Sequence, residues 1–233
     1  MSTLLIRLAA PLQSWGADSK FEERRATMRE PTKSGVIGML ASALGRRRED
    51  SIDDLAELKF GVRIDQPGLL VRDYHTAKSQ DGKTSYVTHR YYLSDAVFVV
   101  GLEGGAEFLQ ALDEALHSPV FPLFLGRRSC PPVGRLSLGI SEKQLEDALS
   151  AVPWQPGYSA RKRTVGAEDF LNLTVVLDSA KVGDLRRRDM PVSFSQKHRR
   201  YVYRYIVDNP KAVTIMSSFQ TEHDAFSGVG EGM

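Results

Sequence analysis

The sequence predicts an α+β fold of the ferredoxin-like kind, in which helices cover a β-sheet, and three observations support this. Over about the first 140 residues, apolar segments alternate with segments of helical period in the order strand, helix, strands, helix, strand. A polar stretch between two apolar segments predicts a protruding β-hairpin. A connector containing Pro and Gly then leads to a smaller, β-rich C-terminal part. RNA-recognition modules share this plan, but so do many enzymes, so the fold alone assigns no function.

The first elements have clear local signals. Residues 3–9 are apolar, which predicts a buried first strand, and residues 12–29 have no regular period, which predicts a loop. Residues 32–44 predict a helix, because their apolar side chains recur at helical spacing. Thr32 is placed to cap the start of this helix, and Gly45 stands where a glycine commonly ends one.

The next elements are predicted from the helical or strand-like spacing of apolar residues and from turn signals. Residues 75–90 are polar and contain the turn signal Asp81-Gly82, which predicts a protruding hairpin or flexible loop. The remaining predicted elements are a helix at 51–58 capped by Ser51, strands at 60–65, 69–73, 91–102 and 120–125, and helices at 106–117 and 141–151.

The C-terminal third is predicted to be a separate, smaller region. Residues 171–177 and 200–207 predict strands, whereas residues 184–199 between them are polar and basic. The predicted division is a ferredoxin-like domain at 1–152 with its hairpin at about 74–92, a β-rich region at 153–217, and a disordered tail at 218–233.

Composition narrows the class of protein. The 233 residues carry a net charge of +2, with 31 basic and 29 acidic side chains, and a single cysteine, Cys130. There is no apolar run of membrane-spanning length and no secretion signal, so we expect a cytoplasmic protein without membrane contact. The near-neutral total allows a basic groove, because the basic residues are clustered. The clusters are 24–25, 46–48, 127–128, 161–163, 186–188 and 197–200.

The segment at the start of the first helix is a candidate phosphate site. Residues 30–35 read EPTKSG, so a helix N-terminus, with its free N–H groups and positive dipole end, adjoins Lys33, Ser34 and Gly35. The alternative is an ordinary capped helix with an exposed lysine. The Gly-rich stretch of a Walker A loop is missing, which disfavours nucleotide hydrolysis.

Two further loops carry residue types that bind nucleic acid. Arg127, Arg128 and Ser129 follow Gly126 in a loop that two prolines end, and two arginines there suit phosphate contacts or stacking on bases. Trp15 lies in the loop after the first strand and is a candidate for base stacking. The alternatives are a solvated surface turn for the arginines and burial of the tryptophan against the core.

One constellation permits an enzymatic interpretation. A metal-independent ribonuclease needs a general base, a general acid and a cation near the phosphate, and Tyr74, His75 and Lys78 have the side chains for these roles. The alternative is the base of a hairpin with polar side chains. No histidine has metal-ligand spacing to acids or cysteine, so we expect no metal and no other cofactor.

Five segments, in order, resemble the CasD family of subunits of Cascade, the type I-E CRISPR surveillance complex, within the RAMP superfamily. They lie within about the first 135 residues. The segments are LAAPLQSWG at 8–16, PTKSGVIG at 31–38, RDYHT at 72–76, YLSDA at 92–96 with Phe98, and LGRRSCP at 125–131.

The resemblance implies a ferredoxin-like (RRM-like) RAMP body with a hairpin thumb, here at about residues 78–90. It implies a non-catalytic subunit that binds and caps the 5′ handle of the CRISPR RNA and contacts the Cascade backbone subunit and large subunit, with target DNA nearby. A relative in type I-C systems is the processing ribonuclease, which keeps the enzyme alternative open. The residues that we expect at the handle are Lys33, Ser34, Gly35, Arg127, Arg128, Ser129, Trp15, Arg24 and Arg25.

Overall fold

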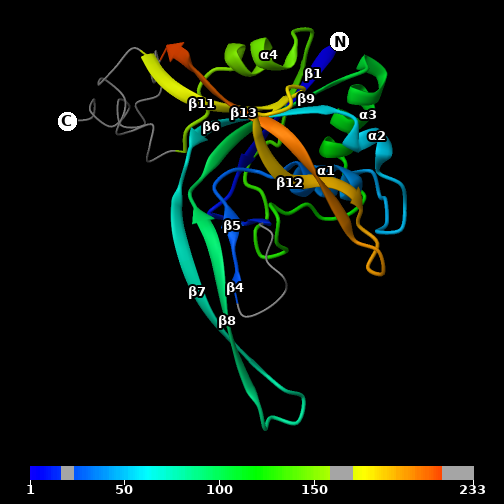
Figure 1. Ribbon diagram of the computed structural model, residues 1–233, viewed down its shortest axis with the longest axis vertical. Helices are drawn as coiled ribbons and strands as arrows, with labels where there is room; N and C mark the ends of the chain where they lie inside the picture. Colours follow the sequence, from blue (N-terminus) through cyan, green and yellow to red (C-terminus); the bar gives the residue numbers. More distant parts are fainter. Residues whose placement is uncertain (17–23, 158–169, 217–233) are drawn as a thin grey trace, which may run out of the picture.

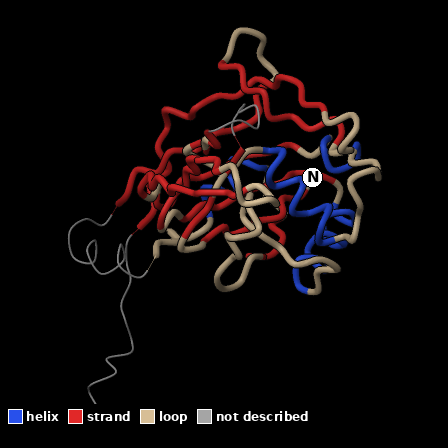
Figure 2. The backbone as a smooth tube through the Cα atoms, turned by 90° about the horizontal axis from the view of Figure 1, so that it is seen from below, coloured by secondary structure: helices blue, strands red, loops and turns tan. Residues whose placement is uncertain are grey.

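The computed structural model describes residues 1–16, 24–157 and 170–216 and is a mixed α+β structure dominated by one large sheet (Figure 1). This sheet has seven strands in the order β10-β1-β9-β6-β11-β13-β12, and every adjacent pair is antiparallel. The predicted tail at 218–233 lies outside the described residues. Figure 2 shows most of the helical segments to one side of the strands.

The sheet strands are β1 (Ser2–Ala9), β6 (Lys59–Gln66), β9 (Val97–Gly104), β10 (Ser137–Ser141), β11 (Phe170–Ser179), β12 (Leu185–Ser193) and β13 (Arg200–Met216). The helices are α1 (Lys33–Ala43), α2 (Asp53–Ala56), α3 (Ala106–His117) and α4 (Leu145–Ala151). The hairpin strands are β7 (Leu69–Lys78) and β8 (Ser85–Ser94), and the short strands are β2 (Leu12–Gln13), β3 (Trp15–Gly16), β4 (Arg24–Arg25) and β5 (Thr27–Met28).

Apolar side chains on both faces of the sheet build two cores. On β1, Leu4, Ile6 and Leu8 belong to the larger core with α1 and α3, whereas Leu5 belongs to a smaller core with α4. This division follows from the strand, because successive side chains point to opposite faces. The sheet is therefore covered on both faces over its N-terminal strands.

The local signals of the first helix are confirmed. The hydroxyl of Thr32 accepts a hydrogen bond from the N–H of Gly35 at 3.3 Å, as an N-cap residue does. Gly45 has a φ of +76°, the left-handed conformation expected just after a helix. The helices at 51–58 and 141–151 are shorter than predicted, since α2 and α4 begin at Asp53 and Leu145.

The hairpin is present and longer than predicted. Strands β7 and β8 pair from Leu69–Ser94 to Lys78–Ser85 and project from the body, which Figure 1 shows at the bottom of the view. The single strand predicted at 91–102 is wrong, because Asp95, with a φ of +55°, separates β8 from β9. The loop predicted at 12–29 also contains β2 and β4, which flank β8.

The strand predicted at 120–125 is also wrong. Pro119 and Pro122 remove two backbone donors from this segment. The N–H groups of Val120 and Phe121 donate to the carbonyls of Ala43 and Ser42 at 3.0 and 3.2 Å, so the segment closes the end of α1 instead of joining the sheet. Within the first 152 residues, the fourth strand that joins the large sheet is β10.

The C-terminal strands extend the same sheet. Strand β11 pairs with β6, and β13 and β12 follow it outward. Strand β12 falls in the polar stretch at 184–199, where the sequence predicted no strand. As the edge strand it tolerates Pro191 and several arginines, because one of its sides is unpaired. The separate domain at 153–217 stays a prediction. Among the described residues, no helix has the length and apolar character needed to cross a bilayer.

Candidate nucleic-acid interface

The base of the β7–β8 hairpin gathers arginines from three separate parts of the chain. Strand β4 runs parallel to β8, which places Arg25 opposite Arg90 and Arg24 opposite His89. The loop after Leu125 closes against the same place, because the N–H of Ser14 donates to the carbonyl of Leu125 at 3.1 Å. The side chain of Arg24 lies outside the described residues.

Glycine is required where that loop turns. Gly126 has a φ of +86°, and a Cβ added to it would lie 1.6 Å from the carbonyl oxygen of Ser14. This close approach brings Arg127 inward, where its Nη2 donates to the carbonyl of Arg25 at 2.9 Å. Two basic segments that are 102 residues apart thus meet in one place.

A buried tyrosine supports the arginine loop. The guanidinium of Arg127 lies over the ring of Tyr92, with its Cζ 4.6 Å from the ring centroid. Burial opposes ionisation of the Tyr92 phenol, but hydrogen bonds with Arg127 and Ser129, and the charge of Arg127, lower its pKa. The stacking holds the guanidinium in a fixed orientation, as cation–π pairs do.

The cluster contains buried nitrogen atoms that the protein itself does not satisfy. In the described part of the chain, the buried side-chain atoms without a hydrogen-bond partner are Arg25 Nε, His89 Nδ1, Arg90 Nε and Arg127 Nη1. A buried donor without a partner costs about 1–3 kcal/mol, and more when it is charged. All four belong to the hairpin base, so this place is suited to an anionic ligand with several acceptor oxygens. We call Arg25, His89, Arg90, Tyr92 and Arg127 the hairpin-base cluster.

The rest of the predicted loop lies beside this cluster. Arg128 and Ser129 are exposed, and Cys130 is buried with Ser129 Oγ 3.8 Å from its sulfur. Burial raises the pKa of the Cys130 thiol, which keeps it protonated at neutral pH and supports a structural role. Arg128 and Ser129 are therefore accessible to a ligand held at the cluster.

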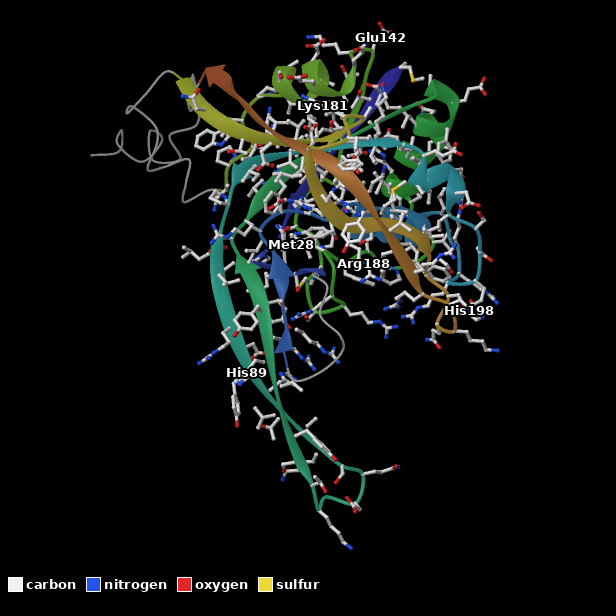
Figure 3. All side chains as sticks on the ribbon, in the orientation of Figure 1. Met28, His89, Glu142, Lys181, Arg188 and His198 are labelled. Atoms are coloured by element: carbon white, nitrogen blue, oxygen red, sulfur yellow. The ribbon has the colours of Figure 1, made fainter. Side chains whose placement is uncertain are left out.

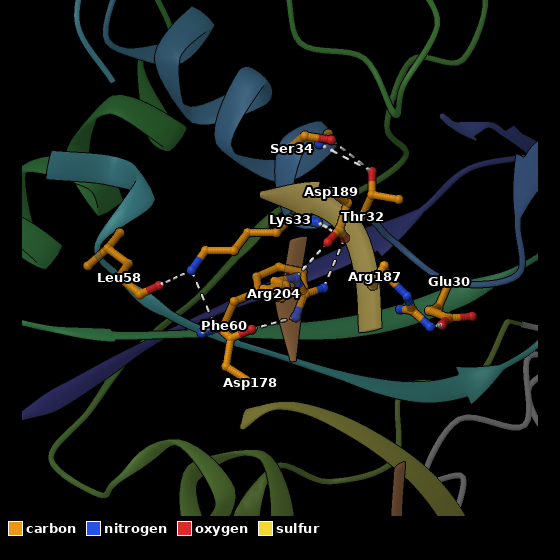
Figure 4. Close-up of polar contacts among 11 residues, drawn as sticks. Glu30, Thr32, Lys33, Ser34, Leu58, Phe60, Asp178, Arg187, Asp189 and Arg204 are labelled. Atoms are coloured by element: carbon orange, nitrogen blue, oxygen red, sulfur yellow. Dashed lines mark hydrogen bonds and ion pairs between the residues drawn. The ribbon is translucent and has the colours of Figure 1, made fainter. Parts of the chain in front are cut away.

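The predicted phosphate site at Lys33 is contradicted by the structure. The N–H of Lys33 donates to the Oδ2 atom of Asp189 at 2.9 Å, so a carboxylate of the protein already occupies the start of α1. Its ammonium is buried and donates to the carbonyl of Leu58 at 2.7 Å and to Asp178 at 3.1 Å (Figure 4). Lys33 therefore makes internal contacts, and its partners come from far along the chain.

The residues around Lys33 are correspondingly structural. Ser34 is half-buried, with its hydroxyl 3.5 Å from that of Thr32. A Cβ added to Gly35 would lie 2.9 Å from the ring of Trp15, so this glycine allows close packing. Trp15 is fully buried and its Nε1 donates to Gln13 Oε1 at 3.1 Å. Base stacking by Trp15 is therefore wrong, and its alternative, burial against the core, is confirmed.

The residues proposed for catalysis do not converge. Tyr74 packs edge-on against His89, with ring centroids 5.7 Å apart, whereas His75 Nδ1 lies 3.1 Å from Asp73 Oδ2. Tyr74 and His75 are neighbours on β7 and so point to opposite faces, and Lys78 lies about 13 Å from Tyr74 along the strand and about 10 Å from His75. Over residues 1–16, 24–157 and 170–216, no group of three His, Cys, Asp or Glu side chains is placed to hold a metal.

Sequence reasoning found part of the cluster and missed the rest. Arg25 and Arg127 were predicted and lie together, while His89 and Arg90 were not predicted as site residues. Their sequence signal is a basic pair directly before two tyrosines on a hairpin strand. Its meaning depends on the pairing of β4 with β8, which no local pattern reveals.

The chain is similar to known CRISPR-associated proteins. Residues 3–207 match the family described as "CRISPR-associated protein (Cas_Cas5)". The chain is 37% identical over 161 residues to "CRISPR system Cascade subunit CasD" of Escherichia coli (strain K12), which covers 59% of this chain and 70% of that protein. It also resembles a chain of a "CRISPR RNA-guided surveillance complex", with 33% identity, 91% of each chain covered and a TM-score of 0.75.

A second solved structure, "Crystal structure of Cas protein", is 39% identical to the chain and has a TM-score of 0.71, with 91% of this chain and 95% of that chain covered. The family match extends over most of the sequence, from the first strand into β13. The chain therefore belongs to the Cas_Cas5 family of CRISPR-associated proteins.

Proposed function

We propose that this protein is the non-catalytic RNA-binding subunit of a CRISPR surveillance complex of the Cascade kind, and that the hairpin-base cluster holds the 5′ handle of the CRISPR RNA. The observation that carries the proposal is the set of four buried nitrogens without partners, all of them in this cluster. Phosphate oxygens supply several acceptors in a small volume, and arginine is the side chain best suited to them.

The chemistry of the cluster favours single-stranded RNA. Phosphate contacts fix the position of the strand, while splayed bases are read by aromatic side chains and polar groups. Arg127 and Arg90 supply cations, and the exposed Tyr74 lies against His89 next to them. The family membership and the likeness to a chain of an RNA-guided complex point to the same ligand.

The element order supports a ferredoxin-like (RRM-like) RAMP body. Elements β1, α1, β6, β9, α3 and β10 follow the β-α-β-β-α-β plan, and their strands lie in the order β10-β1-β9-β6. In this proposal the β7–β8 hairpin is the thumb and presses against neighbouring subunits, the backbone subunit and the large subunit, with target DNA nearby. Its exposed apolar side chains, which suit such contacts, are Leu69, Leu70, Tyr74 and Tyr86.

Replacing Arg127 with glutamine tests the handle site. We expect handle RNA to bind about tenfold to a hundredfold more weakly, because one charge-assisted contact of about 1.5–3 kcal/mol is lost. The slope of log K against log salt is expected to fall by about 0.7, the value for one phosphate on a single strand. Labelled handle RNA titrated at several salt concentrations measures both quantities.

Matched variants separate this site from general charge effects. Arg135→Gln removes one exposed cation elsewhere and is expected to leave RNA binding unchanged. Lys33→Met, compared per folded molecule, is also expected to bind normally, because its ammonium faces inward. Equal binding by the Arg127→Gln and Arg135→Gln proteins would contradict the proposed handle site.

The non-catalytic part of the proposal has its own test. A metal-independent ribonuclease would need Tyr74, His75 and Lys78 around one phosphate, and their positions on β7 hold them apart. We expect repeat RNA to remain intact when it is incubated with the protein in EDTA and analysed by gel electrophoresis. Specific cleavage that disappears in His75→Ala would overturn this part of the proposal and leave the binding site standing.

A further inference from the structure

Four basic runs of the sequence lie outside the hairpin-base cluster, and three of them are in the described part of the chain. Residues 46–48 follow α1, residues 186–188 lie on β12, and residues 197–200 lead into β13. The β12–β13 hairpin rests on α1, because a Cβ added to Gly38 would lie 3.6 Å from the ring of Phe194. The charges of Arg199 and Arg48 both act on the phenol of Tyr201, although burial dominates and raises its pKa. The loop after α1 and the loop between β12 and β13 therefore lie next to each other.

The β12–β13 hairpin is strongly basic on its outside. Residues 185–207 contain seven lysines and arginines and a single acid, Asp189. That acid faces inward, where it accepts hydrogen bonds from the N–H of Lys33 and from Arg204. Arg187 also faces inward and pairs with Glu30 at 2.5 Å. The inward charges are thus neutralised within the protein.

The outward charges form the second surface. Arg46 is held by Asp54 at 2.5 Å, and the exposed Glu49 and Asp50 stand beside it in the same loop. On the β12–β13 side, the sequence from 190 to 207 contains no acid. We call the following exposed residues the distal basic surface: Arg48, Arg186, Lys197, His198, Arg199 and Arg200.

One contact indicates what this surface presents to a ligand. The Cζ atom of Arg186 lies 4.4 Å from the ring centroid of Tyr203, which is 55% exposed. The guanidinium covers one face of the ring, so the tyrosine fixes the direction of the cation. Fixed cations without a pocket for bases bind a phosphate backbone and carry no sequence information.

The two basic regions are well separated. Figure 3 shows His198 of the distal basic surface at the right of the view, whereas His89 of the hairpin-base cluster lies at the lower left, beside β8. This separation suits the simultaneous binding of two polyanions.

We propose that the distal basic surface binds the phosphate backbone of duplex DNA without sequence preference. Duplex DNA carries one charge per about 1.7 Å of its axis, twice the density of one strand, and so gains most from a surface of fixed cations. Identifying this duplex as the target DNA of an RNA-guided complex rests on the function proposed above. The charge arrangement itself does not depend on that function.

The test uses the full-length protein and a variant with Lys197→Gln and Arg200→Gln. A short labelled duplex of arbitrary sequence is titrated at salt concentrations between about 50 and 200 mM. The slope of log K against log salt is expected to fall by about 2, because each phosphate contact to B-DNA contributes about 0.9. Near 0.1 M salt the affinity is expected to fall about tenfold to a hundredfold.

A matched control carries Arg135→Gln and Lys143→Gln, which remove the same charge from exposed positions elsewhere. We expect it to bind the duplex as the unaltered protein does, and thermal unfolding shows whether each variant is folded. Equal duplex binding by the two double variants would overturn the inference. The inference would also be overturned if the Lys197→Gln/Arg200→Gln protein kept its affinity for the duplex but no longer bound a protein partner when the complex is assembled. The surface would then recognise an acidic protein.

Handle RNA separates this inference from the handle site. The Lys197→Gln/Arg200→Gln protein is expected to keep its affinity for handle RNA, whereas Arg127→Gln is expected to lose that affinity. Weaker binding of the duplex together with unchanged binding of handle RNA supports the distal basic surface alone. If the Lys197→Gln/Arg200→Gln protein loses affinity for single-stranded RNA and for the duplex equally, the assignment to duplex DNA is overturned. That outcome does not affect the Arg127 result.

Discussion

Replacing Arg63 with methionine is expected to lower the free energy of unfolding by about 3–5 kcal/mol. Arg63 and Asp65 are completely buried and form two hydrogen bonds of 2.7 and 2.8 Å. The guanidinium also donates to the carbonyls of Leu149, Val152 and Pro153, at and just after the end of α4. The substitution leaves a buried carboxylate without its cation and three carbonyls without their donor.

An exposed pair provides the control for this prediction. Arg46 and Asp54 form a still shorter pair, at 2.5 Å, on the surface, where water competes for both charges. Arg46→Met is expected to cost less than about 1 kcal/mol. Urea unfolding of both variants compares the two costs directly. If Arg63→Met costs no more than Arg46→Met, the guanidinium is not what attaches α4 to β6.

Much of the fold could be predicted because its signals are local. The cap at Thr32, the glycine at Gly45 and the turn at Asp81-Gly82 each act within a few residues, and all three elements are present. Strand β12 could not be predicted, because its charges and Pro191 are tolerated only at the edge of a sheet. A sequence window does not reveal which strand will be at an edge.

The candidate site was only partly predictable for a related reason. Lys33 has the local surroundings of a phosphate-binding lysine, but its partners Asp178 and Asp189 lie 145 and 156 residues away. Arg127 was found because a glycine and two prolines mark its loop. Arg90 became part of the site only through the long-range pairing of β4 with β8.

Replacing Asp178 with alanine is expected to lower the free energy of unfolding at neutral pH by about 3–5 kcal/mol. The carboxylate accepts hydrogen bonds from Lys33 Nζ, from Arg204 and from the N–H of Phe60 (Figure 4). Arg204 keeps its second partner, Asp189, whereas Lys33 keeps only the carbonyl of Leu58. The main cost is therefore a buried ammonium without a counter-charge.

The pH dependence of this variant identifies the ammonium as the cause. Burial lowers the pKa of Lys33 below its ordinary value of 10.5, and Asp178 acts in the opposite direction. Without Asp178 the native pKa falls further, so between that pKa and 10.5 the unfolded state holds more protons than the native state. Stability then rises with pH in this window. The deficit of Asp178→Ala is expected to shrink as the pH approaches 10.5 in urea unfolding measured over this range.

A double variant, Asp178→Ala with Lys33→Met, removes the titrating group and is expected to show the same deficit at neutral and alkaline pH. A deficit in Asp178→Ala that does not change with pH would instead assign the cost to Arg204 or Phe60. The three C-terminal strands each contribute one charge to this network, namely Asp178 from β11, Asp189 from β12 and Arg204 from β13. Asp178 neutralises the ammonium of Lys33 and Asp189 occupies the start of α1, so the C-terminal strands account for the internal role of Lys33. The hairpin-base cluster remains the place proposed for RNA.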